Sequence, residues 1–207
     1  MRYISSFLKK GSSSFERLRI KNKHFSIVSN NCWGGFVYQH FGLRYETPFI
    51  GLFLFAPDYI RLLEDLKGNL GLSLNFIEAD CSKYGHILKE WNAYDKYPIA
   101  LLGQDIEVHF FHYKSKKEAS EKWGRRLARM DYDRMLVKFS DRDLCDEGLI
   151  ARFDSMRYKN KVCFVSKPYE NLKSVIFVRE CLGLPMIEDE WKYTKRYYNI
   201  YKVINNL

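Results

Sequence analysis

The amino-acid sequence predicts a three-layer α/β fold in which helices flank a mostly parallel sheet. Short apolar runs alternate along the 207 residues with longer amphipathic segments. Most of these runs are continuously apolar instead of alternating, which is typical of strands covered on both faces. With 46% hydrophobic and 16% aromatic residues, a chain of this length can bury a sizeable core.

Seven apolar runs are expected to form strands. They are residues 24–29, 48–55, 98–102, 106–112, 135–139, 161–166 and 175–178. Three residues, Gly103 to Asp105, separate two of these runs, which is the length of a tight hairpin. One strand of that pair therefore runs antiparallel to the other.

Five amphipathic segments are expected to form helices: residues 35–41, 57–66, 116–130, 141–153 and 188–205. The last has the clearest periodicity, because Tyr193, Tyr197 and Ile200 recur at spacings of three and four. No composition shift marks an interdomain boundary. We therefore expect one α/β domain over residues 24–207, preceded by a basic leader at residues 1–23.

The formal net charge of +9 favours an anionic partner, such as a phosphorylated ligand or an anionic membrane surface. Nucleic acid is a less favoured partner, because none of the known groove-reading or base-stacking motifs is found. Five cysteines without framework spacing indicate a reducing compartment. No apolar run reaches the roughly 18 residues of a membrane-spanning helix, and the leader lacks the apolar stretch of a signal peptide. We expect a cytoplasmic protein that can contact the inner membrane face.

The most informative candidate site is the turn after the first predicted strand. In open α/β sheets, ligands bind where strands end and helices begin, because the helix N-terminus offers free N–H groups. The candidate ligand-binding residues of this turn are Asn30, Asn31, Trp33, Gly34 and Gly35. The asparagines suit a sugar hydroxyl, a phosphate or an oxyanion, and the glycines allow close backbone approach.

Cys32 lies within the same turn and has two interpretations. At a helix N-terminus its thiol is a candidate nucleophile with a lowered pKa. The alternative is a small buried hydrophobic residue, beside asparagines that only cap the helix.

Two further groups of residues are candidates. His112, at the end of a predicted strand, is a candidate general acid or base. The alternative is an interior histidine whose ring nitrogens are hydrogen-bonded to the backbone. Arg126 and Arg129 suit bidentate binding of a phosphate, or belong to a solvated helix face with internal ion pairs. His109 and His112 diverge on a strand, which is poor zinc geometry, so we expect no metal site.

Four separated blocks carry a resemblance to a known family: NNCWGGFVYQHFGLRYETPFIGLF, DYIRLLEDL, YPIALLGQDIEVHFFHYKSKKEASEKWGRRLARM and KYTKRYYNIYKVIN. In order and spacing they resemble a bacterial family of unknown function whose members are commonly described as exopolysaccharide biosynthesis proteins. The resemblance runs from about residue 24 onward and leaves the basic leader outside it. The matching positions include Asp105, which is preceded by Gln104 where the family pattern has an acid.

The resemblance implies a transferase of exopolysaccharide or capsule biosynthesis that uses a nucleotide-sugar or acyl-CoA donor and no tightly bound cofactor. Under this hypothesis Cys32, His112 and Asp105 are the catalytic candidates. The alternative is a non-catalytic accessory protein of the polysaccharide-assembly machinery. The expected partners are a saccharide or an activated donor, with peripheral contact to an anionic membrane.

Overall fold

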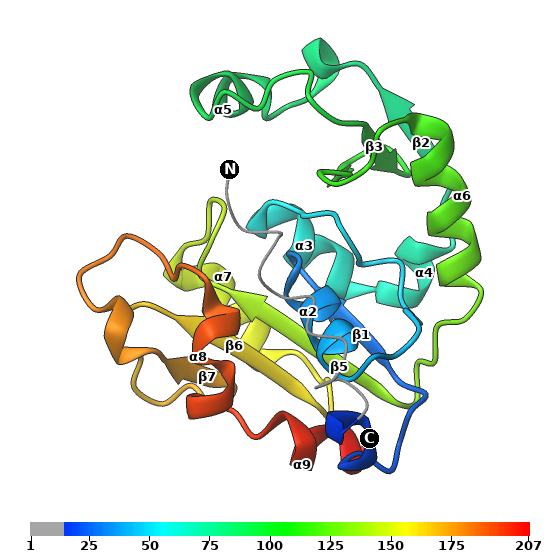
Figure 1. Ribbon diagram of the computed structural model, residues 1–207. Helices are drawn as coiled ribbons and strands as arrows, with labels where there is room; N and C mark the ends of the chain where they lie inside the picture. The colour runs from blue at the N-terminus through cyan, green and yellow to red at the C-terminus, as the bar shows by residue number, and fades with distance from the viewer. Residues whose placement is uncertain (1–14) are drawn as a thin grey trace.

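The computed structural model describes residues 15–207, which form two separate sheets (Figure 1). A four-stranded parallel sheet has the order β1-β5-β6-β7, and a three-stranded antiparallel sheet has the order β2-β3-β4. The strands of the parallel sheet are β1 (Ser26–Ser29), β5 (Met135–Ser140), β6 (Lys161–Val165) and β7 (Val175–Phe177). The predicted α/β class with a mostly parallel sheet and an antiparallel hairpin is confirmed.

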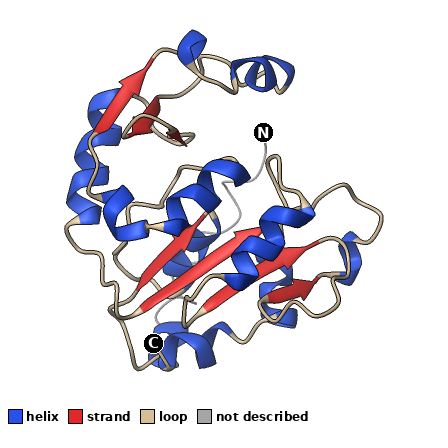
Figure 2. Ribbon diagram, turned by 180° about the vertical axis from the view of Figure 1, so that it is seen from behind, coloured by secondary structure: helices blue, strands red, loops and turns tan. Residues whose placement is uncertain are grey.

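Helices cover both faces of the parallel sheet (Figures 1 and 2). Along β5, Leu136 contributes to one hydrophobic core, while Val137 and Phe139 contribute to another on the opposite face. The first face is covered by α2 (Trp33–His40), α8 (Glu190–Tyr197) and α9 (Ile200–Asn205); the second is covered by α3 (Ala56–Glu64) and α7 (Glu147–Ser155). Burial on both faces explains why these strands are continuously apolar.

The antiparallel sheet belongs to a small lobe, residues 72–113, which arches over the parallel sheet (Figure 1). Its elements are β2 (Leu74–Ile77), a helical turn η1 (Ala79–Cys81), α5 (Gly85–Glu90), β3 (Ile99–Leu102) and β4 (Ile106–His109). The connection into the lobe is α4 (Leu66–Leu70), and the connection out of it is α6 (Lys116–Leu127). Gly103, with φ of +64°, begins the β3-β4 hairpin turn at a backbone conformation that favours glycine.

The strand expected over residues 48–55 is not formed, so this prediction was wrong. Gly51 has φ of +71°, which interrupts extended backbone, and Pro48 has no N–H to donate. Phe53 makes an isolated antiparallel bridge with His109, through hydrogen bonds of 2.9 and 3.0 Å. The segment is apolar because it passes between the end of β1 and β4, where burial and not strand pairing demands apolar side chains.

The single helix expected over residues 188–205 is divided into α8 and α9. Tyr198 has extended backbone, with φ of −142° and ψ of 117°, which ends α8. The Asn199 side chain then caps α9 by accepting a hydrogen bond of 3.0 Å from the Lys202 N–H. Asparagine is favoured at this capping position, so a local polar contact outweighs the continuous apolar stripe.

The helix expected from residue 141 begins later, at Glu147. The Asp146 carboxylate accepts a hydrogen bond of 2.8 Å from the Leu149 N–H and so caps α7. Residues 141–146 instead form a loop at the carboxyl edge of the parallel sheet. β2 was not predicted, because its residues are partly exposed and form no apolar run. A short helical turn, η2 (Arg179–Cys181), follows β7.

The described part of the predicted leader, residues 15–23, packs against α9. Ile20 is buried in the same core as Ile204, and the Lys21 N–H donates a 2.7 Å hydrogen bond to Asn205 Oδ1. Residues 1–14 of the leader lie outside the described residues. Across the part of the chain that the structure describes, no helix combines the length and apolar character needed to cross a bilayer.

Candidate functional site

A cavity of about 450 Å³ opens between the carboxyl edge of the parallel sheet and the small lobe. Its walls come from the β1-α2 turn, the loop after β5, the beginning of α8 and several segments in or next to the lobe. Elements far apart in the sequence therefore converge on one concave surface. Its volume lies within the range of about 300–1,000 Å³ typical of small-molecule sites.

Aromatic side chains line the cavity from two sides. Trp33, Phe36 and Trp191 come from α2 and α8, and the rings of Phe36 and Trp191 stack with centroids 6.1 Å apart. Phe53, Trp91, Tyr97 and Phe111 come from the opposite side. Trp91 remains 45% exposed and Phe111 49% exposed, so about half of the surface of each side chain is not buried in the core and can contact a ligand. Exposed apolar surface gathered in a cavity is typical of a ligand-binding site.

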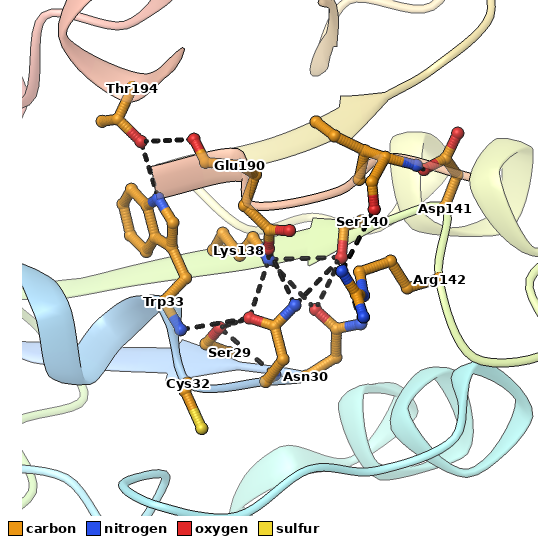
Figure 3. A network of polar contacts seen from close by, with 12 residues as sticks. Ser29, Asn30, Cys32, Trp33, Lys138, Ser140, Asp141, Arg142, Glu190 and Thr194 are labelled. Carbon is orange, nitrogen blue, oxygen red and sulfur yellow. Dashed lines mark hydrogen bonds and ion pairs between the residues drawn. The ribbon is translucent and has the colours of Figure 1, made fainter. Parts of the chain in front are cut away.

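A buried polar network forms beside the cavity (Figure 3). Lys138 on β5 is fully buried and forms an ion pair with Glu190, the first residue of α8. The Lys138 ammonium also donates hydrogen bonds to Asn31 Oδ1 at 3.0 Å and to Ser140 Oγ at 3.2 Å. Asn31 Nδ2 in turn donates a 2.7 Å hydrogen bond to Glu190 Oε1, so Asn31, Lys138 and Glu190 are linked pairwise. The network joins the carboxyl ends of β1 and β5 to the C-terminal helices.

The asparagines of the predicted turn belong to this network. Asn31 lines the cavity, and its Oδ1 also accepts a 3.1 Å hydrogen bond from the Trp33 N–H at the start of α2. Asn30 is buried and is not part of the cavity lining, and its Nδ2 donates to Ser140 Oγ at 3.4 Å. Trp33 lines the cavity but is 1% exposed, and its indole N–H donates to Thr194 Oγ1 at 2.8 Å. Helix capping and cavity lining therefore occur together at Asn31.

Two carboxyl groups in the cavity have pKa values shifted in opposite directions. Burial raises the pKa of Asp143, the nearby Glu190 charge raises it further, and Arg142 acts against both. Burial alone would also raise the pKa of Glu190, but the Lys138 ammonium outweighs this and lowers it. The cavity therefore offers one carboxyl group suited to proton transfer and one held in its ionised form.

The loop after β5 carries left-handed backbone at Asp143, with φ of +57°, and at Leu144, with φ of +68°. Aspartate tolerates this conformation, whereas for leucine it is strained by on the order of 1–3 kcal/mol. The surroundings fix the loop, because the Asp143 carbonyl accepts a 2.8 Å hydrogen bond from Ala56 N–H. Asp141 anchors the preceding turn by accepting from the backbone N–H groups of Ser166 and Ile187. The strain is thus stored where Asp143 enters the cavity.

Cys32 lines the cavity, but its side chain points away from the polar network (Figure 3). Burial, followed by the charge of Glu190, raises the pKa of the Cys32 thiol to about 11. The prediction of a lowered pKa was therefore wrong, because desolvation outweighs the favourable position at the helix N-terminus. The observed environment is that of a half-buried, uncharged thiol in the cavity wall.

Cys32 is expected to resist alkylation at neutral pH. A pKa of about 11 in place of the ordinary 9.0 makes its thiolate fraction about a hundredfold smaller. Iodoacetamide at pH 7.5 should modify the exposed Cys81 much faster than Cys32. Peptide mass spectrometry over a time course measures both rates, with the urea-unfolded chain as the control. Equal rates in the folded chain would contradict this assignment.

The structure does not place His112 or Asp105 in the cavity lining. His112 follows β4 in the antiparallel sheet, is exposed, and donates from its backbone N–H to the Gly51 carbonyl at 2.9 Å. Asp105 lies at the hairpin turn, where it forms a surface ion pair with Arg61 at 2.7 Å. Neither residue is brought together with Cys32 in this cavity.

The remaining predicted residues also lie outside the lining. A Cβ at Gly34 would come within 3.0 Å of the Ile27 side chain, so this glycine lets α2 pack closely on β1. Gly35 faces Ile50 at ordinary contact distance. Arg126 is buried and donates to Tyr113 Oη, and Arg129 donates to the Tyr45 carbonyl at 2.7 Å.

Sequence reasoning missed the charged residues of the cavity and of the polar network beside it. Lys138 left one signal, because a lysine inside the otherwise apolar run MLVKF implies a buried charge that needs a partner. Glu190 and Asp143 left no local signal, since a helix start and a loop commonly carry acids. Among residues 15–207, no group of three or more His, Cys, Asp and Glu side chains is arranged to hold a metal ion.

Comparison with known proteins places the chain in a family. The sequence pattern of a family described as Domain of unknown function (DUF1919) matches residues 3–207, so the chain belongs to that family. The chain is also similar to an uncharacterized protein of Haemophilus influenzae, with 31% identity over 185 residues, which cover 87% of this chain and 82% of that protein. The match begins at residue 3, so the interpretation that the basic leader lies outside the family region was wrong.

Proposed function

We propose that the protein is a transferase of exopolysaccharide or capsule assembly that binds the sugar part of its substrate in the aromatic cavity. One observation supports this proposal above the others. The cavity combines aromatic rings on two sides with two carboxyl groups, Asp143 and Glu190, whose pKa values are shifted in opposite directions. We place this activity in the cytoplasm, at the inner membrane face.

The aromatic lining favours a sugar over a purely charged ligand. A sugar ring has an apolar face of C–H groups, which stacks on an aromatic ring, and a rim of hydroxyl groups, which need hydrogen-bond partners. Trp91 and Phe111 present exposed ring surface, and Asn31 and Asp143 provide polar groups in the same cavity. Arg142 also lines the cavity and offers a cation for the phosphate of a nucleotide-sugar donor.

The two carboxyl groups suit a sugar transfer in which each has a separate role. Asp143 accepts the proton of the acceptor hydroxyl as that oxygen bonds to the anomeric carbon. The bond from the anomeric carbon to the donor phosphate breaks, and the nucleotide leaves with the electron pair. Glu190 remains ionised beside Lys138 and stabilises positive charge that develops on the sugar ring.

A non-catalytic glycan-binding accessory protein is the second candidate. The observation that favours it is the ion pair with Lys138, which neutralises Glu190 and leaves it no free charge for catalysis. Asp143 in turn lies 4.0 Å from Arg142 Nε, so each of the two carboxyl groups has a cation beside it. In this case the cavity binds a glycan and no donor is consumed.

Trp91→Ala is expected to weaken sugar-ligand binding. Thermal shift against nucleotide sugars, free sugars and acyl-CoAs measures binding, because a ligand at 100 times its Kd adds about 2.7 kcal/mol of stability. Loss of the Trp91 ring should reduce affinity for the responding ligand about tenfold. Tyr132→Ala is the matched control, since Tyr132 is a partly exposed aromatic residue outside the cavity lining.

The panel separates the candidates. A shift with a nucleotide sugar, reduced by Trp91→Ala and unchanged by Tyr132→Ala, supports the transferase. A shift with glycans alone supports the accessory protein, and a shift with acyl-CoA alone excludes sugar transfer. Absence of any shift across all ligand classes would contradict a sugar-binding cavity.

A further inference from the structure

Four arginines form a cluster at the C-terminal end of α6 and the segment after α2. Arg126 lies over the Tyr45 ring at 5.0 Å, and Arg129 donates to the Tyr45 carbonyl at 2.7 Å. Arg44 immediately precedes Tyr45, and Arg125 precedes Arg126. We call Arg44, Arg125, Arg126 and Arg129 the arginine cluster. Burial first, and then the positive charges of the other three, lower the pKa of the Arg129 guanidinium.

The cluster contains more positive charge than its acidic neighbours balance. Glu46 is the carboxylate that acts on Arg129, and its Oε1 also lies within hydrogen-bond distance of His24 Nδ1, at 3.1 Å. Arg126 is buried, and its hydrogen bonds go to the neutral oxygens of Tyr113 and Ile50.

The two exposed members of the cluster have no such contacts. Across the described residues, neither Arg44 nor Arg125 makes a side-chain hydrogen bond or an ion pair. Glu118 on α6 is paired with Lys122, and Glu121, one turn before Arg125, forms no ion pair with it. Arg44 adjoins Tyr45, which Arg126 and Arg129 both contact, and Arg125 adjoins Arg126 on α6, so the backbone brings these residues to one region. Guanidinium groups without carboxylate partners are suited to an external oxyanion, which they can bind in a bidentate manner.

The cluster lies at the opposite edge of the parallel sheet from the cavity. The Glu46 carbonyl accepts a 2.8 Å hydrogen bond from Ser26 Oγ, and Ser26 is the first residue of β1. The cavity begins at Asn31, just beyond the last residue of β1. A ligand at the cluster therefore does not occupy the sugar cavity.

We propose that the arginine cluster is a phosphate-binding site, in which exposed Arg44 and Arg125 contact the phosphate oxygens while Arg126 and Arg129 supply fixed positive charge. The ligand is a phosphate group carried either by an anionic lipid headgroup or by a soluble diphosphate. The site is independent of the function proposed for the cavity. Its position on a face away from the cavity leaves sugar binding unobstructed.

Binding of full-length protein to two probes tests the site. One arm measures pyrophosphate by isothermal titration calorimetry, and the other measures flotation with phosphatidylglycerol and phosphatidylcholine vesicles against phosphatidylcholine alone. The double variant Arg44→Gln/Arg125→Gln should bind the relevant probe at least about tenfold more weakly. Lys159→Gln/Lys173→Gln is the charge-matched control, because it removes two exposed cations far along the chain and keeps the leader intact.

Each outcome has a defined meaning. Loss of pyrophosphate binding in the arginine variant alone supports a soluble phosphate ligand, and loss of flotation in that variant alone supports a lipid headgroup. Equal binding by the arginine and lysine variants in both arms overturns the proposal, as does absence of binding by the wild type in both. The thermal shift with free sugars, which carry no phosphate, should be the same in all these proteins, so the two proposals fail separately.

Discussion

Replacing Lys138 with methionine is expected to destabilise the fold by about 3–5 kcal/mol, because Glu190 then remains buried without its cation. Both side chains are almost completely buried, at 0% and 6% exposure. Typical domains have only about 5–15 kcal/mol of stability, so the variant should unfold at much lower urea concentration. Urea denaturation at pH 7, followed by circular dichroism, measures the difference.

The double variant Lys138→Met/Glu190→Gln is the control for lost packing. It removes both charges while keeping side chains of similar length, so most of the lost stability should return. If the single and double variants are equally unstable, the ion pair is not the cause. Restoration by the second substitution would separate electrostatic cost from a simple packing defect.

The pH dependence of the same variants gives an independent check. In the wild type the pKa of Glu190 is lowered in the folded state, so its contribution is present above the unfolded value of about 4.3 and is lost as pH falls. In Lys138→Met, burial without the cation raises the folded pKa of Glu190. The variant should then lose less stability on acidification than the wild type does, since protonation relieves the buried charge.

Much of the fold follows from local patterns in the sequence. Continuous apolar runs predicted the strands of the parallel sheet, because a strand buried on both faces has apolar side chains at nearly every position. The run at residues 48–55 is also continuously apolar, but for a different reason, since it is buried as an irregular segment between two sheets. Composition reports burial, whereas Gly51 and the pairing partner decide whether a buried segment becomes a strand.

Only the part of the candidate site that lies in the turn between β1 and α2 could be predicted from the sequence. Asn31 was found because it follows a strand and precedes a helix, but its partner Glu190 lies 159 residues later. His112 could share an edge with Cys32 only if its strand ran parallel in the same sheet as β1, whereas β4 belongs to the antiparallel sheet. Contacts of such long sequence separation depend on how the two sheets are placed, which no local pattern encodes.

Asp143→Asn is expected to reduce sugar transfer by about 10²–10⁴-fold, the usual contribution of a general acid or base. Asparagine has the same shape and tolerates the left-handed backbone at this position, so the cavity should keep its form. Initial rates with the nucleotide sugar that gives the largest thermal shift measure the loss. Asp189→Asn is the matched control, because Asp189 also lines the cavity and also has a positive φ, of +47°, yet its side chain is 52% exposed.

The stability of Asp143→Asn should change in the opposite direction to its activity. Burial raises the folded pKa of Asp143, so its stabilising contribution is complete below the unfolded value of about 3.9 and is lost as pH rises through the folded pKa. At pH 7 the asparagine variant should therefore be more stable than the wild type, and the difference should vanish below about pH 3.9. A variant that is more stable but transfers no sugar would show that the Asp143 carboxyl group lowers the stability of the fold and is required for proton transfer. A variant that transfers at the wild-type rate would show that the cavity binds sugars without using this carboxyl group.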